Sequence, residues 1–115
     1  MVTVSIIRDR KKRYLCVHLQ GHAGQAEKGH DLVCASASIL AYTVAQIVMA
    51  YDNHGDLVCD PIIRLNDGDA IVSWKCKDDE SYADSLHTLF VAQTGYALLA
   101  HTFPQFVELN TVGEA

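Results

Sequence analysis

The chain has 115 residues, of which 50% are hydrophobic and 20% are charged, as in an ordinary globular domain with one buried core. Its formal net charge of −5 argues against nucleic acid as the main ligand, because phosphate contacts need an excess of positive charge. No apolar run approaches the ~18 residues that a membrane-spanning helix needs. We therefore expect one domain over residues 1–115, with no direct nucleic acid binding and no membrane association.

The start of the sequence predicts a β-hairpin. Apolar residues alternate over residues 2–8 and again over residues 14–20, as in half-buried strands, and the charged segment 9–13 between them predicts the turn. The alternating N-terminus also lacks the basic-then-apolar layout of a secretory signal peptide. We therefore expect the protein to be cytoplasmic.

The cysteine pattern predicts free thiols rather than a disulfide framework. No C-x-x-C pair occurs, which leaves a zinc ribbon or a thioredoxin-like motif unsupported. A reduced cysteine in a strand is usually a small hydrophobic residue, and we expect this of three cysteines in strand-like segments. They are Cys16, Cys59 and Cys76.

A loop and a long helix follow the first hairpin. Residues 21–30 hold three glycines and show no periodicity, which predicts a mobile loop. From Asp31 to about Asn53 the apolar period becomes helical, with Asp31 as a plausible N-cap and Gly55 as a plausible stop. The predicted apolar stripe of this helix is Val33, Ala37, Leu40, Val44, Ile47 and Tyr51.

A second hairpin is predicted by strand-like segments at residues 62–65 and 70–76. They flank Asn66-Asp67-Gly68-Asp69, a strong turn signal because Asp and Gly tolerate a positive φ. A second helix is predicted over residues 79–101, because the acidic residues at its start suit the helix dipole. Its predicted apolar face includes Leu86, Phe90 and Ala97.

The end of the chain completes the predicted fold. Pro104 ends the second helix, residues 106–109 could add a last strand, and residues 111–115 are expected to be a frayed tail. The element order is then β-β-α-β-β-α-β. This order predicts an α+β fold with a mainly antiparallel sheet and two helices packed on one face.

The residues that point to chemistry are His22 and Cys34, the latter at the start of the predicted helix. N–H groups of a first helical turn favour a thiolate, and a nearby histidine can take the thiol proton. The N–H groups of Cys34 and Ala35 could then stabilise an oxyanion. Taken separately, a cysteine on a helix is more often a core residue, and a histidine after a strand is more often a surface residue.

Several neighbours could support this pair. Ser38 lies one helical turn after Cys34 and could donate a hydrogen bond near the site. Asp31 could cap the helix or orient His22, and capping needs no tertiary assumption. Small residues leave room for a substrate backbone: Gly21, Ala23, Gly24, Ala35 and Ser36.

Two other arrangements of these residues remain open. His30 is a competing base, although its place beside the helix cap suggests a solvated side chain. A metal site from His22, His30, Asp31 and Cys34 has suitable ligand types but no recognised ligand spacing. We therefore expect neither a metal nor another cofactor.

The segment from Gly21 to Ser38, GHAGQAEKGHDLVCASAS, resembles the motif of the ribosomal-processing cysteine protease family Prp. The family pattern is G-H-A, a short spacer, G-x-D, two aliphatic residues, Cys, small residues and Ser, and every anchor is present. Ser36 is a mild departure, because Ala or Gly is expected there. The length and the element order also resemble that family, so the resemblance covers essentially the whole chain.

The resemblance implies a function and a set of roles. Cys34 would be the nucleophile and His22 its proton-transferring partner, with Gly21, Ala23, Asp31, Ala35 and Ser38 supporting the site or the substrate. The implied substrate is the N-terminal extension of ribosomal protein number twenty-seven of the large subunit. The family also implies a homodimer, and a histidine loop that moves to admit substrate.

Two functions of other classes stay open beside this one. The basic segment from Arg8 to Arg13 holds five of the nine Lys and Arg residues, and could bind a ribosomal component in a non-catalytic assembly factor. Alternatively, Cys34 could be a redox-sensing thiol. The cleavage-site residues, the dimer surface and the resting state of the loop are not predicted by the sequence.

Overall fold

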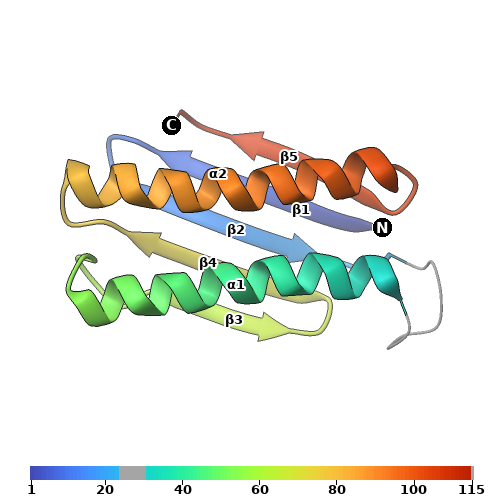
Figure 1. The fold of residues 1–115 in the computed structure, drawn as a ribbon, viewed down its shortest axis with the longest axis horizontal. Helices are drawn as coiled ribbons and strands as arrows, with labels where there is room; N and C mark the ends of the chain where they lie inside the picture. Colours follow the sequence, from blue (N-terminus) through green and yellow to red (C-terminus); the bar gives the residue numbers. More distant parts are fainter. Residues whose placement is uncertain (24–30, 115) are drawn as a thin grey trace.

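A computed structural model describes residues 1–23 and 31–114 of the chain. Within this described part, five strands and two helices follow one another in the predicted order (Figure 1). The strands are β1 (Val2–Asp9), β2 (Tyr14–Gln20), β3 (Ile62–Asn66), β4 (Asp69–Lys75) and β5 (Val107–Val112), and the helices are α1 (Leu32–His54) and α2 (Asp79–Thr102).

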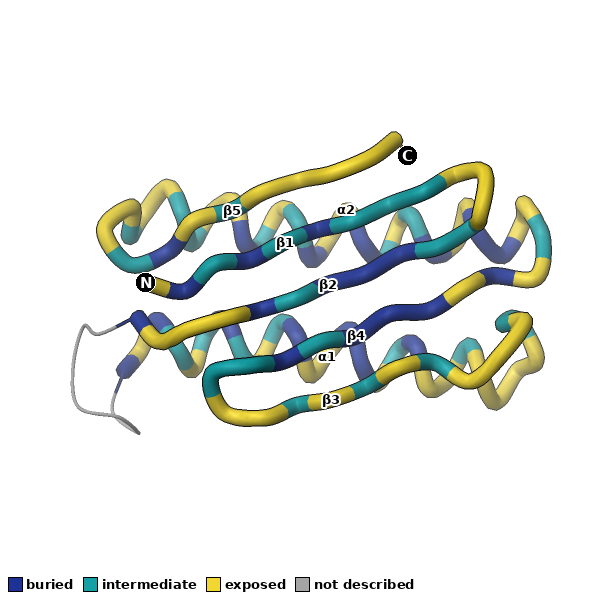
Figure 2. Tube along the Cα trace, turned by 180° about the vertical axis from the view of Figure 1, so that it is seen from behind, coloured by how far each residue is buried: buried dark blue, intermediate teal, exposed yellow. Residues whose placement is uncertain are grey.

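The strands form one sheet in the order β3-β4-β2-β1-β5. The pairs β1–β2, β2–β4 and β3–β4 are antiparallel, whereas β5 runs parallel to β1. Both helices cover the same face of the sheet, and Figure 2 shows the opposite face without a covering layer. The predicted α+β fold, mainly antiparallel with two helices on one face, is confirmed.

The core lies between this sheet and the two helices. The central strands supply fully buried side chains such as Ile6, Val17 and Trp74, and the edge strands are mostly exposed (Figure 2). Two buried polar groups of the core are hydrogen-bonded, because Trp74 Nε1 donates to Ser85 Oγ at 2.9 Å and the Tyr96 hydroxyl donates to the Ala37 carbonyl at 2.9 Å.

The two helices approach each other closely at Gly95. A Cβ atom at this position would lie 2.9 Å from Leu40 Cδ1, which is tighter than ordinary contact. Glycine therefore costs some helix propensity here but lets α1 and α2 pack together.

The predicted ends of α1 are confirmed. Asp31 caps the N-terminus, and Gly55 ends the helix in the left-handed region at φ 83°. The predicted apolar stripe is only partly right, because Leu40, Ile47 and Tyr51 are only partly buried. Alanines line the buried face and allow the helix to approach the sheet closely; this face comprises Val33, Ala37, Ala41, Val44, Ala45 and Val48.

The predicted apolar face of α2 is wrong at two positions. Phe90 is 67% exposed and Ala97 is also exposed, whereas Leu86 is partly buried. This helix carries apolar residues all round, so hydrophobicity alone does not select the face that meets the sheet. The buried face is Ser81, Tyr82, Ser85, Leu89, Ala92 and Tyr96.

The last strand is longer than predicted and begins one residue later. Thr111 and Val112 pair with Ile6 and Ile7 of β1, so the prediction that a frayed tail starts at Thr111 is wrong. Parallel pairing with β1, at the other end of the sequence, stabilises these residues, and no local sequence pattern predicts such a pairing.

By length and composition alone α1 could span a membrane, with a mean hydropathy of 1.9 over an 18-residue window, although isolated serines and threonines interrupt its apolar runs. A third of that window is buried inside the structure, where α1 packs on the sheet. Core helices of globular domains have this same composition.

All four cysteines are free, as predicted. Cys16 and Cys76 are buried, and burial raises the pKa of both thiols. Cys59 differs from the prediction, because it is exposed and lies outside the strands. Of the loop predicted over residues 21–30, residues 24–30, which include His30, lie outside the described residues.

Candidate active site

Cys34 lies in the first turn of α1, and Asp31 fixes that turn. The Asp31 Oδ1 atom accepts hydrogen bonds from the backbone N–H of Val33 at 2.9 Å and of Cys34 at 3.2 Å. Asp31 is buried, whereas Cys34 is partly exposed. Of the two roles considered for Asp31, the structure shows the capping role.

The segment after β2 contacts the Cys34 sulfur directly. The Ala23 backbone N–H donates to Cys34 Sγ at 3.3 Å, so the residue that follows His22 touches the thiol. The neighbouring backbone is tied down as well, because Gly21 N–H donates to the Gly68 carbonyl at 2.9 Å and the Met1 ammonium donates to the His22 carbonyl. These contacts hold the histidine segment beside the start of α1.

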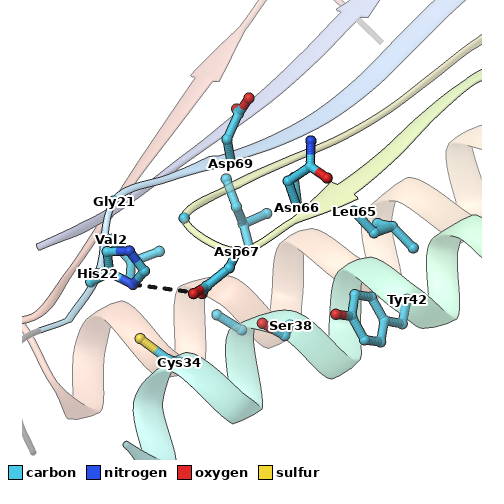
Figure 3. Close-up of a pocket in the computed structure, with 14 residues that line it drawn as sticks. Val2, Gly21, His22, Cys34, Ser38, Tyr42, Leu65, Asn66, Asp67 and Asp69 are labelled. Carbon is cyan, nitrogen blue, oxygen red and sulfur yellow. Dashed lines mark ion pairs between the residues drawn. The ribbon is translucent and has the colours of Figure 1, made fainter. Parts of the chain in front are cut away.

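His22 and Cys34 line one pocket of about 410 Å³ (Figure 3). Gly21 and Ser38 line it too, whereas Ala23 is buried and is not part of the lining. Ala35 is exposed on the helix surface and is not part of the lining. Five further residues extend the pocket along α1 and the β3–β4 turn: Tyr42, Leu65, Asn66, Asp67 and Gly68.

The N–H groups predicted to stabilise an oxyanion already have acceptors. That of Cys34 donates to the Asp31 carboxylate, and that of Ala35 donates to the Asp31 carbonyl at 3.0 Å. The second bond is the regular i→i−4 bond of the helix, and the first is the capping bond. Both groups face the helix interior and its cap, so this part of the prediction is wrong.

The turn between β3 and β4 belongs to the site, and the sequence analysis missed it. Asp67 Oδ1 lies 3.8 Å from His22 Nδ1, and both side chains are about half exposed. The turn was predicted as a hairpin, but nothing local shows where a hairpin tip packs. The pairing of Gln20 with Asp69, at the ends of β2 and β4, brings this tip beside His22.

A second histidine–carboxylate pair lies next to the pocket. His18 Nε2 and Asp69 Oδ1 are 2.8 Å apart, and Arg64 lies 3.5 Å from the same carboxylate. The hydrogen bond with His18 lowers the pKa of Asp69, and the charge of Arg64 acts in the same direction. Asp69 is therefore an ionised group at the rim of the pocket.

In residues 1–23 and 31–114, no three side chains of His, Cys, Asp or Glu are grouped closely enough to hold an ion. His30, one member of the possible ligand set, lies outside that part of the chain.

Solved structures share this fold. One of them is Prp from S. aureus, described as an essential ribosomal processing protease, in complex with a covalently linked product peptide. It superposes with a TM-score of 0.67 at 23% sequence identity, over 97% of this chain and 100% of the other. Its complex with a substrate peptide gives the same TM-score and coverage at 20% identity. SMU.848 from Streptococcus mutans gives 0.66 at 26% identity, over 99% of this chain and 96% of the other.

The comparison with protein families agrees with the fold and with the motif around Cys34. No curated protein matched the chain. The family described as Cysteine protease Prp matches residues 1–93, which include both strands of each hairpin, all of α1 and every residue of the pocket. The chain therefore belongs to the cysteine protease Prp family.

Proposed function

We propose that the protein is an endopeptidase that removes the N-terminal extension of ribosomal protein number twenty-seven of the large subunit, using Cys34 and His22 as a catalytic dyad. The observation that carries this proposal is the shared pocket, which joins a partly exposed thiol at a helix start to an imidazole, in a member of a cysteine protease family. The S. aureus neighbour, described as a ribosomal processing protease, supports the substrate class.

The proposed reaction begins with proton transfer from the Cys34 thiol to His22. The thiolate attacks the scissile carbonyl carbon and forms a tetrahedral intermediate, and the imidazolium then donates its proton to the leaving amine. A thioester to Cys34 remains. His22 next takes a proton from water, the hydroxide attacks the thioester, and the cleaved extension leaves as a carboxylate while the thiol is restored.

The Ala23 N–H group supports the first of these steps. It donates to Cys34 Sγ, and a hydrogen bond to an ionised acceptor is stronger than one to a neutral acceptor. The bond therefore strengthens when the thiol loses its proton. Since the N–H groups of Cys34 and Ala35 are engaged in the helix, Ala23 is the backbone donor that acts on the sulfur from outside α1.

The shape of the pocket suits an extended peptide with an apolar side chain. Gly21 is small and lies near the dyad, and Tyr42 of α1 and Leu65 of β3 provide apolar surface further from it (Figure 3). Ala37, which is also small, lines the same pocket. A substrate backbone can pass the small residues while one of its side chains packs against the tyrosine ring and the leucine.

The direct test is incubation of the purified protein with the extended ribosomal protein, followed by mass spectrometry of the product. We expect the parent chain to release the extension, and Cys34→Ala and Cys34→Ser to release none. Cys59→Ser is the matched control, because Cys59 is an exposed thiol outside the pocket. Equal cleavage by Cys34→Ala and the parent would refute the proposal.

The same assay separates the endopeptidase from the assembly factor. Arg10, Lys11 and Lys12 are exposed at the β1–β2 turn, at the opposite end of the molecule from the pocket (Figure 1). Replacing all three with glutamine should leave cleavage within about twofold, because exposed charges that far away are screened by salt. Loss of ribosomal binding in this variant, with no cleavage by the parent, would favour the assembly factor.

Cytoplasmic location and a homodimer complete the proposal. The outer surface of the helix layer exposes large apolar side chains, including Phe90, Val91 and Leu98 of α2, and such a surface suits a second copy of the chain. We expect light scattering after gel filtration to give twice the chain mass for the parent. Val91→Asp should give the monomer mass, and an unchanged dimer would exclude this surface.

A further inference from the structure

The β3–β4 turn contacts the ring of His22 on two sides. Asp67 Oδ1 lies 3.8 Å from Nδ1, and Gly68 lies against the other ring nitrogen. A Cβ atom on Gly68 would be 2.7 Å from Nε2, closer than real Cβ atoms come to other atoms, and 3.2 Å from Cε1, which is tighter than most real contacts. The ring therefore occupies the space that any other residue at position 68 would fill.

The turn also holds the backbone of the histidine segment. The Gly68 carbonyl accepts the N–H of Gly21, the residue directly before His22. The ends of β2 and β4 pair at Gln20 and Asp69, so the turn is fixed to the sheet one residue away on each strand. The β3–β4 turn therefore contacts the ring of His22 and also bonds the backbone of the residue before it.

We propose that the β3–β4 turn is a positioning element for His22, in which Gly68 leaves the space for the ring and Asp67 places a carboxylate beside Nδ1. This inference rests on the proposed dyad, because it explains how the imidazole of His22 is oriented to take the proton of Cys34. Cys34 loses its proton only to a ring at the correct distance and angle, and small displacements of a reacting group cost large factors in rate. The Asp67 carboxylate stabilises the imidazolium that this transfer creates.

A matched pair of glycine variants tests the space at Gly68. Gly68 and Gly55 have similar positive φ values, 76° and 83°, but a Cβ at Gly55 would meet nothing within 4 Å. Alanine at either position carries the same kind of backbone strain, so both variants should show comparable falls in melting temperature. Gly68→Ala alone should lower kcat, by about tenfold or more, because only its methyl group displaces the ring. Equal kcat values for the two variants would overturn the inference.

A second pair tests the Asp67 carboxylate. Asp67→Asn should lower kcat by about threefold, a small factor because the pair is half exposed, with KM unchanged. Asp67→Glu should recover part of this loss. Asp56→Asn, which removes the same charge from a carboxylate bonded to His54 at the far end of α1, should leave kcat unchanged. If Asp67→Asn and Asp56→Asn cleave equally fast, Asp67 has no positioning role.

A readout without substrate separates failure of this inference from failure of the proposed function. Iodoacetamide alkylation of Cys34 needs the thiolate, and a positioned His22 favours the thiolate by taking the thiol proton. The alkylation rate should fall in Gly68→Ala to the rate of His22→Ala and stay at the parent rate in Gly55→Ala. If the alkylation rates of the variants follow this pattern but the parent cleaves no ribosomal protein, the proposed substrate is wrong and the positioning role stands. A parent rate in Gly68→Ala would overturn the positioning role whatever the substrate.

Discussion

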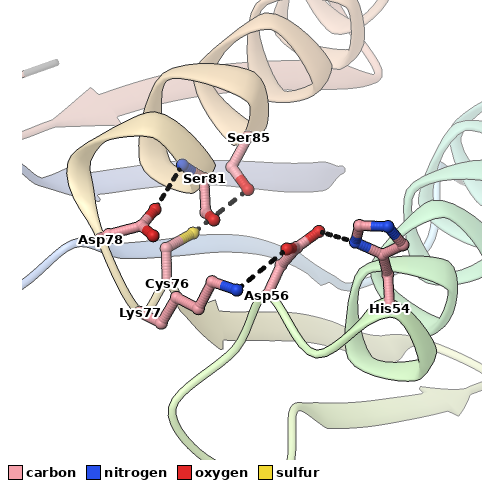
Figure 4. A network of polar contacts seen from close by, with 7 residues as sticks. All are labelled: His54, Asp56, Cys76, Lys77, Asp78, Ser81 and Ser85. Atoms are coloured by element: carbon pink, nitrogen blue, oxygen red, sulfur yellow. Dashed lines mark hydrogen bonds and ion pairs between the residues drawn. The ribbon is translucent and has the colours of Figure 1, made fainter.

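The two ends of α1 carry the same three residue types in different settings. At its N-terminal end, Cys34, His22 and Asp67 share a pocket (Figure 3). At its C-terminal end, His54 bonds Asp56 at 3.1 Å, and Cys76 lies in the same polar network (Figure 4). A list of nucleophile, base and carboxylate would not distinguish the two ends.

The surroundings of the two sulfur atoms do distinguish them. Cys34 Sγ is partly exposed and accepts a hydrogen bond from the Ala23 backbone, which favours negative charge on the sulfur. Cys76 Sγ is buried and donates a hydrogen bond to Ser85 Oγ at 3.2 Å (Figure 4). Burial raises the pKa of Cys76, and the negative charge of Asp56 adds to this effect. The solvent exposure of the sulfur and the direction of its hydrogen bond, rather than the residue types, distinguish the reactive end of α1.

Replacing the two histidines would break this comparison most sharply. His22→Ala should lower kcat by about a hundredfold or more, because a general base of this kind contributes at least that factor. His54→Ala should cleave as fast as the parent, since His54 lies at the other end of α1 and bonds Asp56 there. The measurement is the initial rate of cleavage at saturating substrate. Comparable losses in both variants would mean that the pocket does not hold the base.

Thiol labelling would sharpen the comparison without a substrate. At neutral pH and limiting iodoacetamide, we expect Cys34 to be labelled first, and faster than Cys59 although Cys59 is exposed. Cys16 and Cys76 should stay unlabelled in the folded chain, because burial raises the pKa of both thiols. Peptide mapping by mass spectrometry gives the order. Labelling of Cys59 ahead of Cys34 would contradict an activated thiol at the helix start.

The two helix caps provide a smaller effect. Asp31→Ala should cost about 1 kcal/mol of stability and also slow cleavage, because Asp31 bonds the N–H of Cys34 itself. Asp31→Ser keeps a capping oxygen and should recover the stability. Asp78→Ala removes the cap of α2, which bonds Ser81 N–H at 2.8 Å, and should lower the melting temperature but not kcat. Equal cleavage by Asp31→Ala and Asp78→Ala would show that the cap does not position Cys34.

The smallest expected effect is the pH dependence of stability from Asp69. His18 lowers the pKa of this carboxyl in the folded chain, so the unfolded chain binds the proton more readily. The contribution of Asp69 is therefore present above the ordinary pKa of 3.8 and is lost as the pH falls through the lower pKa of the folded state. In Asp69→Asn, the melting temperature should fall less steeply between about pH 5 and about pH 3. A slope equal to that of the parent would show that the hydrogen bond contributes nothing.

The sequence predicted those site residues that lie near one another along the chain. Cys34 at the helix start, Asp31 as the cap and His22 after a strand all depend on neighbours within a few residues, and the structure places them accordingly. The oxyanion prediction failed because it assumed free N–H groups where the cap and the helix bind them. Asp67 and Gly68 were missed as site residues because their role depends on the pairing of β4 with β2.

By itself the sequence determined the order of the elements, the ends of α1 and the turns of the two hairpins. These features depend on local hydrogen bonding and on backbone conformation, as at Asp31 and Gly55. The tertiary structure alone decided which face of α2 is buried, that β5 pairs in parallel with β1, and that the β3–β4 turn meets His22. These outcomes depend on contacts between segments that are distant in the sequence, so the sequence of any one segment does not determine them.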